Sequence, residues 1–152
     1  MNDSLYRLVY VSRNVIAGGE GELTAEIASI LESARRLNAE ADITGALMYN
    51  RGCFAQVLEG PRDALQDTFE RIQCDERHED VHLLGFEPTV ERGFGEWSMA
   101  YVGQSERSRE AFAGLAPDGG FEPEAMPPER IYTLLVEHLA DGERGRDVGK
   151  AA

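Results

Sequence analysis

The segment from Ile43 to Gly60, ITGALMYNRGCFAQVLEG, constrains the fold of this chain most strongly. Two apolar, strand-like runs meet near Asn50-Arg51-Gly52, where glycine can supply the positive φ that a tight hairpin often needs. Side chains alternate along a strand, so Gln56 shares one face with Phe54 and Leu58. An amide on an apolar face must be hydrogen-bonded by the fold or by a ligand, because burying it unpaired is costly.

Strand and helix patterns alternate on both sides of this hairpin. The predicted elements are a strand over 5–11, a link containing the sequence AGGEGE, an amphipathic helix over about 23–38, the hairpin, a helix that Gly60-Pro61 opens and that ends near Cys74, a strand over 81–86 and, after a break at Pro88, a strand over 94–102. This β-α-β-β-α-β-β order predicts an α+β fold, a ferredoxin-like sandwich with two helices on one face of the sheet.

Helices after residue 103 are expected to cover the open face of that sheet. A strong helical pattern runs from Pro128 to about Ala140, with an apolar stripe of Ile131, Leu134, Leu135 and Leu139, and a weaker one runs over 106–115. The stronger helix is predicted to pack on the open sheet face or on a second subunit. We therefore divide the chain into a core domain over 1–103, a helical extension over 104–141 and a frayed tail over 142–152.

Charge and length exclude several classes of protein. The chain has 152 residues and a formal net charge of −13, which opposes direct binding to nucleic acids and to anionic membranes. We expect a cytoplasmic protein, because the chain has neither an N-terminal signal pattern nor an apolar run of spanning length. Cys53 and Cys74 lack metal-ligand spacing, and His78 and His82 fall outside a helix, so no metal site is predicted.

Three polar side chains are predicted to converge between the first strand and the two helices. Tyr10 shares a strand face with Tyr6 and Leu8, Asn38 lies on the inner stripe of its helix, and Gln56 interrupts the hairpin's apolar face. A phenol and two amides suit a flat heteroaromatic ligand with alternating carbonyl and N–H groups, such as a flavin ring. Taken singly, each residue also fits a structural role in the core or at a helix end.

Several motifs in order resemble the BLUF domains, a family of flavin-binding blue-light sensors. They are RLVYVSR, Asn38 followed by Ile43-Thr44-Gly45, the hairpin GALMYNRGCFAQVLEG, Asp75-x-Arg77-His78, and Phe94-x-x-Trp97-Ser98-Met99. Together they cover about residues 5 to 103. The AGGEGE segment is a departure, because it lengthens the first connection relative to the family's usual one.

The resemblance implies a photoreceptor with a non-covalently bound flavin, FAD or FMN. It implies that Tyr10 and Gln56 form the photoactive pair, that Asn38 holds the polar edge of the ring, and that Trp97 or Met99 approaches the glutamine. Asp75, Arg77 and His78 are candidates to bind ribityl or phosphate oxygens, with a solvated loop as the alternative for the two basic residues and a capping role for Asp75.

The resemblance also implies signalling without enzymatic activity. Light would rearrange the Gln56 amide. From sequence adjacency we hypothesise that the strand predicted over 94–102 passes the change to the C-terminal helix. Because no known effector segment fits after Gly103, we expect a separate protein effector, and we expect a homo-oligomer. The main alternative is a ferredoxin-like module that binds a ligand or protein without photochemistry. An acylphosphatase-like hydrolase is disfavoured, because the first strand lacks an arginine-rich phosphate loop.

Overall fold

The elements of the chain follow the predicted order. The computed structural model describes residues 5–14, 20–50, 53–74, 78–95, 99–102 and 127–142. Its elements are β1 (Leu5–Asn14), α1 (Glu20–Ala41), β2 (Thr44–Asn50), β3 (Cys53–Pro61), α2 (Arg62–Gln73), β4 (His78–Thr89), β5 (Ala100–Val102) and α4 (Pro128–Gly142). The predicted helix over 106–115, the hairpin turn at 51–52 and nearly all of the predicted tail lie outside these ranges. None of the described helices is long and apolar enough to cross a membrane.

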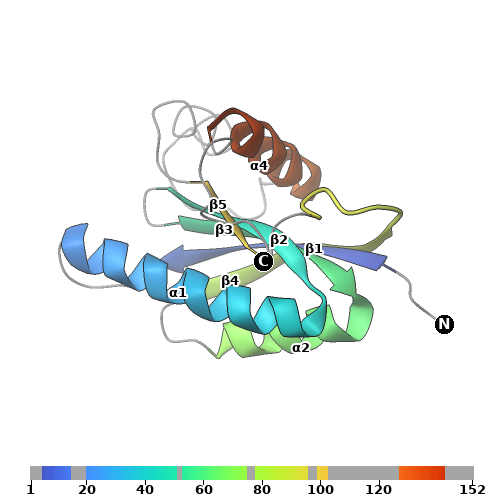
Figure 1. The fold of residues 1–152 in the computed structure, drawn as a ribbon, viewed down its shortest axis with the longest axis horizontal. Helices are drawn as coiled ribbons and strands as arrows, with labels where there is room; N and C mark the ends of the chain where they lie inside the picture. The colour runs from blue at the N-terminus through green and yellow to red at the C-terminus, as the bar shows by residue number, and fades with distance from the viewer. Residues whose placement is uncertain are drawn as a thin grey trace.

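The five strands form one mixed sheet in the order β4-β1-β3-β2-β5. β1 pairs antiparallel with β3 and β4, β2 pairs antiparallel with β3, and β5 runs parallel to β2. Helices α1 and α2 cover one face of the sheet, and α4 covers the other (Figure 1). The ferredoxin-like fold is therefore confirmed, as is the expectation that a C-terminal helix packs on the otherwise open face.

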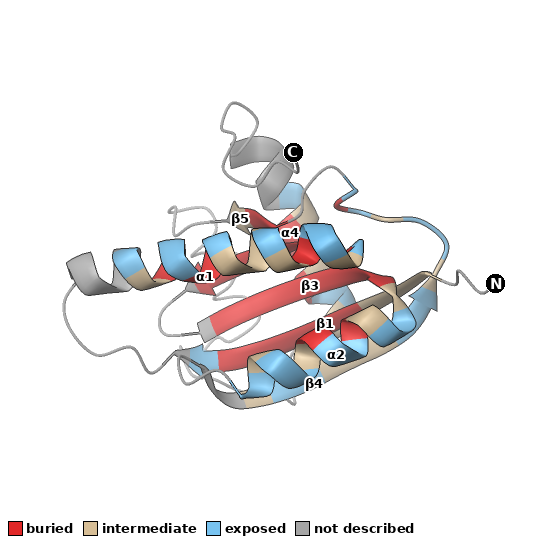
Figure 2. Cartoon of the chain, turned by 60° about the horizontal axis from the view of Figure 1, so that its bottom comes forward, coloured by how far each residue is buried: buried red, intermediate tan, exposed pale blue. Residues whose placement is uncertain are grey.

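Strand alternation separates the interior into two apolar cores, one on each face of the sheet. Figure 2 shows that the buried residues concentrate on the central strands β1 and β3. The core beneath α1 and α2 contains Leu8, Tyr10, Ile30, Leu31, Phe54 and Leu58. The core beneath α4 contains Val9, Val11, Ala55, Val57, Ile131 and Leu135. Gln56 therefore belongs, by its position between Phe54 and Leu58, to the face that α1 and α2 cover.

Helix α1 is longer at both ends than the apolar pattern predicts. It begins at Glu20, so the last three residues of the AGGEGE segment, predicted as link, are helical. Its C-terminus is closed by Asp42, which has a φ of 61°, and by the Ile43 amide, which donates to the Asn38 carbonyl at 2.9 Å. This arrangement matches a Schellman motif, in which the carbonyl of the last turn is satisfied by an amide beyond the helix. The motif fixes where Asn38 lies relative to β2.

Pro88 does not break the sheet, contrary to the sequence prediction. β4 continues to Thr89, and Pro88 lies opposite Tyr6 of β1. β4 is an edge strand with β1 on one side, so a residue without an amide proton is tolerated where no second strand needs that donor. His78, predicted in a charged link, is the first residue of β4. At the start of α2, Pro61 is the N-cap residue rather than part of the first turn.

The strand predicted over 94–102 is wrong at Phe94, Gly95 and Met99, because among the described residues of this range only Ala100–Val102 forms strand, β5. Phe94 instead lies in an irregular segment that the carboxylate of Glu59 holds. The Gly93 amide donates to Glu59 Oε2 at 2.9 Å, and the Phe94 amide donates to Oε1 at 3.0 Å. Arg7 Nε also donates to Oε2, at 2.8 Å. Backbone amides that serve a buried carboxylate are not available for a strand ladder, which explains the interruption.

Candidate functional site

A cavity of about 270 Å³ opens between α1, α2 and the sheet. Its apolar walls are formed by Ile30, Ala34, Leu37, Leu58 and Ile72, and its polar lining comes from Tyr10, Ser33, Asn38, Gln56, Thr68 and Arg71. The cavity thus combines apolar surfaces with a few convergent hydrogen-bonding groups, as small-molecule sites usually do. Its volume lies near the lower end of the range of about 300–1,000 Å³ that is typical of ligand pockets.

Tyr10 and Gln56 meet at the floor of this cavity because the β1–β3 register places them directly opposite each other. The Tyr10 hydroxyl donates a hydrogen bond to Gln56 Oε1. Both side chains are almost fully buried, with 1% of Tyr10 and 4% of Gln56 exposed. Phe69 of α2 packs against the Tyr10 ring, with 5.5 Å between ring centroids. The phenol and the amide therefore form a preorganised pair shielded from water.

The other end of the Gln56 amide faces Met99, the residue just before β5. Gln56 Nε2 donates to Met99 Sδ at 3.3 Å, and Met99 is fully buried. A thioether is a weak acceptor, so this contact orients the amide nitrogen of Gln56 but costs little free energy to break. Of the two residues that the sequence left open, the structure places Met99 against Gln56, while Trp97 lies outside the described residues.

Asn38 reaches the cavity from the last turns of α1. Its side chain is buried, with 2% exposed, and lines the cavity, while its backbone carbonyl accepts the capping bond from Ile43. The role at the helix end, which was the structural alternative for Asn38, is therefore performed by its backbone carbonyl. The side chain is placed independently at the wall that also carries Leu37 and Ser33.

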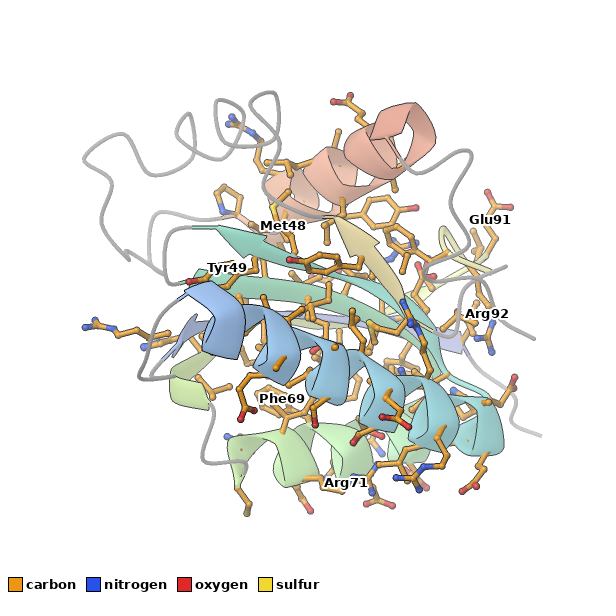
Figure 3. All side chains as sticks on the ribbon, turned by 60° about the vertical axis from the view of Figure 1, so that its left-hand side comes forward. Met48, Tyr49, Phe69, Arg71, Glu91 and Arg92 are labelled. Carbon is orange, nitrogen blue, oxygen red and sulfur yellow. The ribbon has the colours of Figure 1, made fainter. Side chains whose placement is uncertain are left out.

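Arg71 and Thr68 of α2 also line the cavity, and the sequence analysis did not single them out. Arg71 projects from α2 (Figure 3), and its Nη2 donates to Thr68 Oγ1 at 3.4 Å. Thr68 is three residues after the buried Leu65, which is a spacing that places both on the inner face of the helix. This three-residue spacing from Leu65 could have identified Thr68 from the sequence as a residue that faces the sheet. Arg71 gives the cavity a positive charge suited to an anionic ligand group.

Three of the predicted site residues, Asp75, Arg77 and Trp97, lie outside the residues that the structure describes. His78 is placed by its backbone at the start of β4. Their proposed contacts to a ligand stay predictions. The structure does bring together Tyr10, Asn38, Gln56 and Met99, which the sequence selected from four separate elements or links.

Comparison with known families identifies the family of this chain. The chain matches the family described as BLUF, sensors of blue-light using FAD, over residues 5–100. The chain belongs to the BLUF family. The matched range contains every element from β1 to the first residue of β5, including the whole cavity. The resemblance seen in the sequence is thereby confirmed, and the chain belongs to a family of flavin-binding blue-light sensors.

Relatives of known name agree with the BLUF assignment. Photoactivated adenylate cyclase subunit beta of Euglena longa is 40% identical over 99 residues, which are 64% of this chain and 11% of that protein. Among solved structures, BlsA in its ground state has a TM-score of 0.75 at 30% identity and covers 89% of this chain and 87% of its own. BlrB in its dark state has a TM-score of 0.70 at 33% identity, with coverages of 91% and 97%. The chain thus spans about a tenth of the cyclase relative and most of the two solved BLUF chains.

Proposed function

We propose that this chain is a blue-light receptor that binds FAD between α1 and α2 and signals through a rearrangement of Gln56. The observation that carries the proposal is the buried chain of contacts from the Tyr10 hydroxyl to the Gln56 amide and on to Met99 Sδ, at the floor of the cavity. An amide held between a phenol and a weak acceptor can change its orientation with small energetic consequences, which is what a switch requires.

The cavity suits a flavin in its chemistry. A ring edge with alternating acceptors and an N–H group would find the side-chain amides of Asn38 and Gln56, and apolar walls would cover the two faces of the ring. When bound and excited by blue light, flavin supplies a strong oxidant. The protein's own contribution is to hold the ring, exclude water and provide an electron and proton donor in Tyr10.

Tyr10 would supply one electron and its hydroxyl proton to the excited flavin, and the Gln56 amide, to which that hydroxyl is hydrogen-bonded, would bridge the transfer. Both return to Tyr10, so the cycle causes no net oxidation. The amide of Gln56 is left rotated or tautomerised, and it then donates differently toward the ring. The changed hydrogen bond shifts the absorption to the red. The net free energy of one such hydrogen bond is about 0.5–1.5 kcal/mol, which is enough to bias a weakly held element but not to remodel a core.

Output would pass through Met99 and β5 to α4, and then to a separate protein. β5 contains three residues, and its neighbour in the described sheet is β2. In a bacterial light-regulated adenylyl cyclase, at 25% identity, this chain covers 40% of that chain, so a similar domain there is part of a longer protein. We propose that this chain instead acts without enzymatic activity of its own, on a partner polypeptide, as a homo-oligomer in the cytoplasm.

The positive charge of Arg71 at the cavity favours a flavin that carries a phosphate group. FAD and FMN bear phosphate groups and riboflavin does not, so Arg71→Gln should weaken binding of FAD and FMN but not of riboflavin, when affinity is measured by quenching of flavin fluorescence. Arg62→Gln is the matched control, because Arg62 lies on the same helix but pairs with Asp63 and is exposed. Equal weakening for all three flavins would show that Arg71 does not contact the phosphate.

An absorption spectrum of the purified protein, recorded before and after blue light, tests the whole proposal. We expect a flavin spectrum in the dark, a reversible red shift after illumination, and return to the dark spectrum without added reductant. A protein that stays colourless after flavin is supplied would refute the proposal and favour a ferredoxin-like binding module.

A further inference from the structure

Met99 is held at two different atoms by two different elements. Its sulfur accepts a hydrogen bond from Gln56 Nε2 of β3 at 3.3 Å. Its backbone carbonyl accepts a hydrogen bond from Arg35 Nε of α1 at 3.0 Å. The first contact depends on the orientation of the Gln56 amide, whereas the second does not. The two contacts can therefore be lost independently.

Arg35 is kept in a costly environment. Its Nη2 atom is buried and has no hydrogen-bond partner within the part of the chain that the structure describes. Burial of the guanidinium also lowers the pKa of Arg35, since a charged group is less stable away from water. A buried nitrogen without a partner calls for an explanation, and the Nε bond to Met99 is the contact that holds this partly buried guanidinium in place.

The described residues before and after Met99 are held by different kinds of contact. Upstream, Arg92 donates to the Thr44 hydroxyl at 2.9 Å and to the Asp42 carbonyl at 3.0 Å. Next to it, the Gly93 and Phe94 amides are bound by the buried Glu59 carboxylate. Downstream, β5 has three residue pairs with β2 and lies at the edge of the described sheet. Because β5 directly follows Met99 and lies at the edge of the described sheet, we expect a disturbance at Met99 to be transmitted into β5.

We propose that Arg35 is a positioning residue that keeps the backbone of Met99 in place when Gln56 reorients, and so limits how far light loosens β5. The inference rests on the proposed function, because it assumes that the Gln56 amide turns. Turning brings the amide oxygen toward Met99 Sδ and removes the N–H donor, while Arg35 Nε still holds the carbonyl. Arg35, one helical turn before Asn38, thereby connects the ligand-binding helix α1 to the output strand.

Hydrogen exchange of the β5 amides in darkness and under continuous blue light tests the inference. Arg35→Met should leave the flavin spectrum and the red shift intact. In the light, β5 of this variant should exchange on the order of tenfold faster than in lit wild type, because no charged donor remains on the Met99 carbonyl. In darkness, where the Gln56 contact persists, the increase should be much smaller. Arg36→Met is the matched control, since Arg36 is the exposed neighbour on the same helix.

The pattern of results separates a light-dependent restraint from an ordinary structural contact. Equal acceleration in darkness and light, or none in either state, would refute the inference. Arg35→Lys retains a cationic donor and should recover part of the protection in the light; recovery no better than in Arg35→Met would also count against it. If Arg35→Met does not fold, Arg35→Gln takes its place in the same comparison. Absence of a red shift in wild type would instead refute the proposed function.

Discussion

The buried carboxylate of Glu59 offers a sharp test of how the structure holds the segment before Met99. Glu59 is fully buried on the α4 side of the sheet and accepts hydrogen bonds from Arg7 Nε and from the Gly93 and Phe94 amides. Glu59→Gln preserves the shape of the side chain but replaces one acceptor oxygen with an NH₂ group. The perturbation therefore removes a charge and one acceptor without creating a cavity.

The free energy of unfolding lost in Glu59→Gln depends on which position the one remaining side-chain oxygen takes. If it takes the Oε2 position it can serve Arg7 and Gly93, and the new NH₂ group then faces the Phe94 amide. A buried N–H left unpaired costs about 1–3 kcal/mol. Arg7 also loses its charged partner, although its side chain is 23% exposed and its guanidinium lies 3.9 Å from the centre of the Tyr132 ring, which reduces that loss. Together we expect a loss of about 3 kcal/mol in the free energy of unfolding.

Urea unfolding followed by circular dichroism and flavin absorbance would measure this loss. Glu70→Gln is the control, because Glu70 is exposed on α2 and should change the free energy by less than about 0.5 kcal/mol. The dark spectrum and the red shift of Glu59→Gln should be unchanged, since Glu59 lies on the opposite face of the sheet from Tyr10 and Gln56. A free energy of unfolding within about 0.5 kcal/mol of wild type would refute the role assigned to this carboxylate.

Three further predictions concern the site and its scaffold. Tyr10→Phe should bind flavin and lose the normal photocycle, because the electron and proton donor is gone; an unchanged red shift would exclude Tyr10 as donor. Gln56→Leu should retain colour but show no red-shifted state, and a normal shift in flash absorption would remove the amide from the mechanism. Gly45→Ala should destabilise the fold by about 3 kcal/mol, since a Cβ at Gly45 would collide with the Val57 carbonyl oxygen. If that variant unfolds at the same temperature as wild type, the close approach of β2 and β3 at Gly45 would be contradicted.

Much of the site could be predicted because strand alternation is a local property. Period two alone placed Tyr10 with Leu8, and Gln56 with Phe54 and Leu58, on the face that α1 covers. Helical spacing likewise placed Asn38 on the inner stripe of α1, which faces the cavity. The pairing of Tyr10 with Gln56 needed more, because it depends on the register between β1 and β3, which the hairpin and the first crossover set together.

The errors share a physical cause, which is that they depend on contacts distant in sequence. Pro88 is tolerated because β4 became an edge strand, and strand order is a property of the whole sheet. Phe94 is diverted from a ladder by Glu59, a residue 35 positions away. Arg35 and Arg71 were not singled out from the sequence, because the contact of one with Met99 and the position of the other at the cavity depend on the packing of helices on the sheet.

The sheet that carries Tyr10 and Gln56 on one side carries a separate apolar core and α4 on the other. A single layer of backbone therefore separates the face that carries Tyr10 and Gln56 from the face that α4 covers. Under the proposed function, we expect substitutions on the exposed side of α4 to change partner binding while leaving the flavin absorption unchanged. Under that proposal, the choice of partner and the sensing of light could be changed separately.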